Sequence, residues 1–125
     1  MLKTITLVGI GGAIGSILRY LVSDLVHNKI SSTFPWGTLC INITGCFLIG
    51  VVYAFAEKNS IGPEWRFFLA TGICGGYTTF STFSLESFSL LREGHLFYAA
   101  TYIAASVLLG IMATFLPILA IEKLY

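Results

Sequence analysis

Four long apolar stretches fill almost all of this 125-residue chain. The hydrocarbon core of a bilayer is about 30 Å thick, so an α-helix that rises about 1.5 Å per residue needs about 20 apolar residues to cross it. Windows of that length, bounded by charged and turn-forming residues, lie at about 4–26, 34–56, 64–91 and 96–121. We therefore predict an all-α membrane protein, in which residues 1–125 form a single domain of four transmembrane helices.

Composition excludes several other classes of protein. Apolar and aromatic residues make up 56% of the chain and charged residues only 10%, against roughly 25% charged in a typical globular domain. A soluble monomer is therefore excluded. The net charge of +1 lacks the basic excess with which nucleic-acid-binding proteins neutralise phosphates, so we expect a lipid bilayer and no nucleic acid as partner.

The basic residues are divided almost evenly between the two ends of the predicted helices. They are Lys3, Lys58, Arg66 and Lys123 on the side of both termini, and Lys29 and Arg92 on the other, joined by Arg19 if its side chain reaches outward. An excess of Lys and Arg in cytoplasmic loops orients membrane proteins, and here the excess is small. Two interpretations stay open: an antiparallel pair inserted in both orientations, or one orientation set by the weak bias. Because four helices of this size can hardly enclose a pore alone, we favour a dimer.

Two polar side chains lie inside the first two windows. Arg19 would cost about 2.5 to 3.5 kcal/mol at the centre of a span on insertion scales, so it either reaches the interface or has a role inside the assembly. The carboxamide of Asn42 loses hydrogen bonds in hydrocarbon unless it finds partners. An interhelical hydrogen bond is the common role for such a residue, and a donor to a passing solute is the more specific alternative.

The third window contains a run that is poor for a continuous helix. Residues 72–84 read GICGGYTTFSTFS, with adjacent glycines and β-branched threonines that disfavour helix. We expect the third helix to break here, mid-membrane, where freed carbonyl groups are tolerated only if they are buried or line a cavity. Converging carbonyls suit a hard cation, and half-helix N-termini suit an anion. A kink used only for packing is the alternative.

After the expected break, hydroxyl groups alternate with aromatic rings. Ser81 and Thr82 separate Phe80 from Phe83, which share a face at i, i+3. Aromatic stripes are usually core, but ring edges carry partial positive charge that can meet an anion. Glu86, one turn beyond Phe83, is the acid well inside a window, and it fits a structural hydrogen bond, a pore mouth or a proton site.

The last window carries a stripe of polar or small residues four apart. It consists of Tyr102, Ser106, Gly110 and Thr114. Such hydroxyls more often bond to their own or a neighbouring helix than line a path. Together with Asn42 and the hydroxyl-rich half of the third window, they form a narrow, uncharged, donor-lined route that suits a small dehydrated anion better than a cation.

The sequence resembles a known family, the Fluc (CrcB-type) fluoride channels, over essentially the whole chain. The matching motifs are Gly11-Gly12-x-x-Gly15-x-x-x-Arg19-Tyr20, Gly37-Thr38-x-x-x-Asn42-x-x-Gly45 and Gly75-Gly76-x-Thr78-Thr79-Phe80-Ser81-Thr82-Phe83. The third motif is highly specific. Two departures, Ser16 where alanine is usual and Gly110 where some members carry serine, affect only details of the polar route.

The resemblance implies an antiparallel dual-topology homodimer with two pores in the bacterial inner membrane, which exports fluoride passively from the cytoplasm and so reduces its toxicity. It implies a central structural sodium ion held by main-chain oxygens of Gly75 and Thr78. The fluoride pore that it implies comprises Asn42, Phe80, Phe83, Ser81, Thr82, Tyr102, Ser106, Thr114 and Glu86, with Arg19 as a structural or ion-attracting residue.

We therefore expect a channel and no enzyme, because the sequence contains no catalytic triad, metal-ligand cluster or phosphate-binding loop. Two rivals remain. A coupled transporter would need an intramembrane carboxylate, for which Glu86 is the candidate, and a non-transporting assembly subunit would use its glycines and hydroxyls only for packing.

Overall fold

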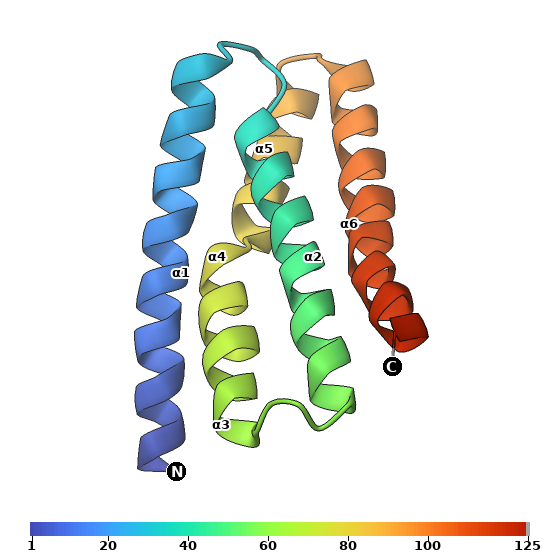
Figure 1. Ribbon diagram of the computed structural model, residues 1–125. Helices are drawn as coiled ribbons and strands as arrows, with labels where there is room; N and C mark the ends of the chain where they lie inside the picture. The colour runs from blue at the N-terminus through green and yellow to red at the C-terminus, as the bar shows by residue number, and fades with distance from the viewer. Residues whose placement is uncertain (125) are drawn as a thin grey trace.

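The computed structural model describes residues 1–124, and over these it is all-helical (Figure 1). The helices are α1 (Leu2–Lys29), α2 (Trp36–Glu57), α3 (Pro63–Arg66), η1 (Phe67–Cys74), α4 (Gly75–Tyr77), α5 (Phe80–Arg92) and α6 (Leu96–Leu124). Among them, α1, α2 and α6 are each long and apolar enough to cross a membrane. The start of α1, the end of α6 and the α2–α3 connection lie at one end of the bundle, and the α1–α2 and α5–α6 connections lie at the other (Figure 1).

The predicted third span is divided into short segments. α3, the wide-turned π-helix η1 and α4 follow one another without a gap, and then Thr78 and Thr79 leave the helix with extended backbone angles. Thr79 caps α5, since its hydroxyl accepts a hydrogen bond from the Thr82 N–H at 3.2 Å. The helical geometry therefore stops at Thr78–Thr79, inside the run 72–84. That this interruption lies mid-membrane stays a prediction.

Glycines let α1 lie directly against η1 and α4. A Cβ on Gly11 would be 2.6 Å from the carbonyl oxygen of Phe68 and 2.9 Å from the Cα of Gly72. A Cβ on Gly15 would meet the Ile73 carbonyl and lie 2.8 Å from the Tyr77 nitrogen. The backbones thus touch, as small residues permit in membrane helices, and this contact positions the end of α4.

On its other side, α2 packs against α6. The Thr114 hydroxyl donates to the Cys46 carbonyl at 3.2 Å, and a Cβ on Gly50 would lie 2.7 Å from the ring of Pro117. Near the α1–α2 connection, Tyr102 is fully buried in a core cluster that includes Phe34. The two rings are edge-on, with centroids 5.7 Å apart. This cluster holds α6 against the start of α2 and against α5.

Candidate functional site

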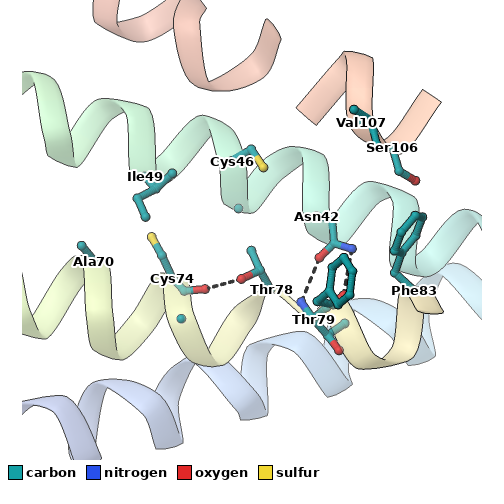
Figure 2. A pocket seen from close by; sticks show the side chains of 13 residues that line it. Asn42, Cys46, Ile49, Ala70, Cys74, Thr78, Thr79, Phe83, Ser106 and Val107 are labelled. Carbon is teal, nitrogen blue, oxygen red and sulfur yellow. Dashed lines mark hydrogen bonds between the residues drawn. The ribbon is translucent and has the colours of Figure 1, made fainter. Parts of the chain in front are cut away.

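An open hollow of about 370 Å³ lies beside the interruption between α4 and α5 (Figure 2). Residues from α2, η1, α4, α5 and α6 line it: Asn42, Gly45, Cys46, Ile49, Ala70, Cys74, Gly75, Thr78, Thr79, Phe80, Phe83, Ser106 and Val107. Six residues predicted from the sequence meet here, namely Asn42, Gly75, Thr78, Phe80, Phe83 and Ser106. Segments far apart in the chain thus converge on one place.

The side chain of Asn42 hydrogen-bonds to the backbone at the interruption between α4 and α5. Its Nδ2 donates to the Thr79 carbonyl oxygen at 3.1 Å, and its Oδ1 accepts from the Thr79 N–H at 2.9 Å (Figure 2). This paired bond satisfies the N–H of Thr79, which would otherwise lack a partner at a costly depth, and adds a second donor to the Thr79 carbonyl. A carboxamide has two N–H donors, and the bond to Thr79 uses one. Asn42 therefore makes the interhelical bond and keeps a second N–H at the hollow.

The same arrangement frees two main-chain carbonyls. In a continuous helix, the N–H of Thr79 would bond to the Gly75 carbonyl and that of Thr82 to the Thr78 carbonyl. Here these N–H groups donate instead to Asn42 Oδ1 and to the Thr79 hydroxyl. The carbonyls of Gly75 and Thr78 thus lose their helical donors, and both residues line the hollow.

A chain of aromatic contacts leads away from the hollow. The ring centroids of Phe80 and Phe83 are 5.7 Å apart, and those of Phe83 and Tyr102 are 5.1 Å apart, both pairs tilted. Phe80 projects outward and is 80% exposed in the single chain. Phe83 is half-buried, and Tyr102 is buried. The three rings connect the open hollow to the interior of the bundle.

Glu86 lies at the far end of this chain of rings. Its Oε1 accepts hydrogen bonds from the Thr38 hydroxyl at 2.5 Å and from the Tyr102 hydroxyl at 3.5 Å. Thr38 and Glu86 also line a second hollow of about 180 Å³ at the end of the bundle near the α1–α2 connection. Its other lining residues are Ser23, Val26, His27, Ile30, Ser32, Thr33, Phe34, Pro35, Trp36 and Gly37. The contacts Phe80–Phe83–Tyr102–Glu86 thus join two hollows.

The predicted hydroxyl stripe of α6 divides into three environments. Tyr102 bonds to Glu86, whereas Thr114 donates to the carbonyls of Cys46 and Gly110, both at 3.2 Å. Ser106 lines the first hollow, and its buried Oγ has no hydrogen-bond partner among the described residues. Ser106 is therefore the residue of the stripe that lines the hollow and whose hydroxyl has an unused hydrogen bond.

The other predicted residues lie outside both hollows. Ser81 and Thr82 are on α5, where their hydroxyls are 3.4 and 3.0 Å from the Thr79 hydroxyl. Arg19 lies on α1. Thr38 was not singled out from the sequence as a site residue. Its spacing of four residues before Asn42, which places both on one face of α2, was the signal that could have found it.

Comparison with known proteins identifies the family. The model of the family described as CrcB-like protein, Camphor Resistance (CrcB), matches residues 6–118. The chain belongs to the CrcB family. Its membership confirms the resemblance drawn from the glycine, asparagine and Thr-Thr-Phe-Ser-Thr-Phe motifs.

Curated members of the CrcB family match this chain over nearly its full length. A relative from Flavobacterium psychrophilum is 44% identical over 98% of this chain and 100% of its own length, and one from Leptospira interrogans is 47% identical over 97% and 96%. A third, from Rhizobium meliloti, is 51% identical over 89% and 90%. All three are named fluoride-specific ion channel FluC. Three helices of this chain are long and apolar enough to span a bilayer, so this CrcB family member is a multi-pass membrane protein. Its family is one of channels, so the protein is not an enzyme.

Proposed function

We propose that this protein is a passive, fluoride-selective channel that exports fluoride from the cytoplasm across the bacterial inner membrane. The names of its relatives support the choice of ion. The observation that carries the proposal is the unbroken series of contacts from the hollow at Asn42, through the rings of Phe83 and Tyr102, to Glu86 and the second hollow.

The groups along this route suit fluoride. A small, strongly hydrated anion must exchange its water for hydrogen-bond donors that hold it only moderately. The second N–H of Asn42 and the unpartnered hydroxyl of Ser106 are donors at the first hollow. The edges of Phe80 and Phe83 carry partial positive charge. None of these four side chains is charged, so they bind the anion weakly enough for it to leave again.

Glu86 marks the other end of the route. Its carboxylate holds the hydroxyls of Thr38 and Tyr102. A hydroxyl rotates readily, so each of these two can donate to an arriving anion in place of the carboxylate. The proposed role of Glu86 is therefore to keep two donors in position.

A second copy of the chain completes the proposed pore. The hollow is open and Phe80 is 80% exposed, although lipid in the hollow would leave the second N–H of Asn42 without a partner. We propose an antiparallel dual-topology homodimer that covers the hollow and has two pores. The balance of four basic residues at one end against two at the other favours insertion in both orientations.

A structural sodium ion belongs to the same proposal. The carbonyls of Gly75 and Thr78 lack their helical donors and are uncharged oxygen ligands of the kind that hard cations prefer. Two from each copy supply four ligands, which fits sodium. Bound there, the ion would supply positive charge near the anion path and offset the cost of an anion in a low-dielectric interior.

A liposome assay tests the function. The purified protein is reconstituted with internal potassium fluoride, a potassium ionophore is added, and an electrode follows external fluoride. We expect release above that of empty liposomes, without any proton gradient. Failure of release refutes the channel, and release that needs a proton gradient indicates the coupled transporter instead.

Matched phenylalanine variants test the route. Phe80→Ile removes an aromatic edge at the hollow, and Phe97→Ile, at a residue of similar exposure on α6 outside it (80% and 78%), is the control. If the contact is worth about 0.5–1.5 kcal/mol, as aromatic pairs are, Phe80→Ile slows efflux by about twofold to tenfold. Equal efflux from the two variants would contradict the assigned route.

A further inference from the structure

A crevice at the end of the bundle where α1 begins has no part in the proposed anion route. It has a volume of about 250 Å³ and lies between the start of α1 and the segment α3–η1. Its lining residues are Lys3, Leu7, Glu64, Trp65 and Phe68. The crevice is therefore apolar on its walls and carries one cation and one anion.

Helix length places this crevice at the surface of the membrane. The 28 residues of α1 extend about 42 Å at about 1.5 Å per residue, whereas the hydrocarbon core is about 30 Å thick. The first turn of α1, which contains Lys3, therefore reaches the headgroup region. Trp65, 59% exposed and edge-on to Phe68 at 5.8 Å, is the type of residue that occupies this depth.

The two charges of the crevice form an exposed ion pair. Lys3 Nζ is 2.8 Å from Glu64 Oε1, with the side chains 72% and 61% exposed. Exposed pairs of this kind contribute little to stability, so they can exchange partners readily. Arg66 lines a different hollow, with Pro63 and Phe67, and so adds no second cation here. The crevice is electrically neutral, with an ammonium and a carboxylate side by side.

We propose that this crevice binds a phospholipid of the phosphatidylethanolamine class. The lipid phosphate accepts hydrogen bonds from Lys3, the primary ammonium of the headgroup donates to Glu64, and an acyl chain lies along Leu7, Trp65 and Phe68. A phosphatidylcholine headgroup has no N–H with which to bond the carboxylate. A phosphatidylglycerol headgroup is anionic and offers Glu64 no cation. The binding is independent of fluoride conduction.

Tryptophan fluorescence gives a direct test, because the chain has two tryptophans, Trp36 and Trp65. Trp36→Phe leaves Trp65 as the reporter in the crevice, and Trp65→Phe leaves Trp36, near the opposite end, as the matched control. Each protein is reconstituted with lipids brominated on their acyl chains, which quench a neighbouring indole. We expect phosphatidylethanolamine to bind beside Trp65 about twofold to fivefold more strongly than phosphatidylcholine, the range that one exposed ionic contact gives, and Trp36 to show no preference.

Charge variants assign the preference to the crevice. Glu64→Gln should abolish the preference seen by Trp65, while Glu122→Gln, which changes an acid of α6 that does not line the crevice, should retain it. Equal quenching by the two lipids, stronger quenching by phosphatidylglycerol, or an unchanged preference in Glu64→Gln overturns the proposal. Native mass spectrometry of the unsubstituted protein gives a second measurement. Bound phosphatidylethanolamine should outlast bound phosphatidylcholine, and the opposite order also overturns the proposal.

Discussion

The closest backbone contact of α1 predicts a sharp difference between two glycines. Gly15 faces the junction of η1 and α4, where an added Cβ would meet the Ile73 carbonyl and lie 2.8 Å from the Tyr77 nitrogen. A Cβ added to Gly9, on the same helix, would have no atom of a neighbouring segment within 4 Å among the described residues. Gly15→Ala must therefore force two backbones apart, whereas Gly9→Ala places a methyl group in open space.

The magnitude follows from comparing the two variants. Both gain about 1 kcal/mol of helix propensity on replacing glycine by alanine, so this gain cancels in the comparison. Overpacking costs about 1–3 kcal/mol, and the atoms in the way at Gly15 are backbone atoms, which cannot turn aside as a side chain can. Gly15→Ala should thus have a free energy of unfolding about 1–3 kcal/mol below that of Gly9→Ala.

Unfolding by SDS in mixed micelles, followed by tryptophan fluorescence, measures this difference. The fluoride efflux assay supplies a second readout, because Tyr77 immediately precedes the interruption at Thr78–Thr79. We expect fluoride efflux to be slower through the Gly15→Ala variant than through the unsubstituted protein, and efflux through Gly9→Ala to be unchanged. Equal stability of the two variants would refute the contact between the backbones of α1 and α4.

Three further substitutions probe the route. Asn42→Leu leaves the N–H of Thr79 unpaired, so it should lose about 1–3 kcal/mol in the same SDS titration; a loss below about 1 kcal/mol would speak against the bond between Asn42 and Thr79. Thr38→Val keeps the volume but removes the hydroxyl that donates to Glu86, and it should slow fluoride efflux; undiminished efflux would exclude Thr38 from the route. Ser106→Ala removes a buried hydroxyl without a partner among the described residues and should stabilise the fold by about 1 kcal/mol while slowing efflux, so destabilisation would show that the hydroxyl is bonded.

The positions of α1, α2 and α6 were predictable because apolar length is a local property of the sequence. The glycines of α1 were predicted as a packing face by their spacing, but spacing alone does not say which helix packs there. The structure identifies η1 and α4 as the partners of Gly11 and Gly15. Choice of partner depends on how all the helices fit together, which no single segment of the sequence encodes.

Side-chain partners were less predictable for the same reason. The sequence left two roles open for Asn42, and the structure gives it a paired bond to Thr79 while one N–H stays free. The stripe Tyr102–Ser106–Thr114 was interpreted as one route, but Thr114 bonds to backbone carbonyls. Four-residue spacing places hydroxyls on one face of α6. The neighbours of that face differ along the helix, because Tyr102 contacts Glu86 and Thr114 contacts Cys46.

The interruption after α4 links the structural and the conducting parts of the proposal. A break in a helix frees carbonyls and N–H groups together. Here the Thr79 N–H donates to Asn42 and the Thr82 N–H to the Thr79 hydroxyl, so the carbonyls of Gly75 and Thr78 are among those left without helical donors. Carbonyls attract cations, and an anion route beside them is favourable only if their charge is balanced. The proposed sodium ion meets this requirement, and exposure of Phe80 beside the same carbonyls explains why one copy of the chain is half of the proposed pore.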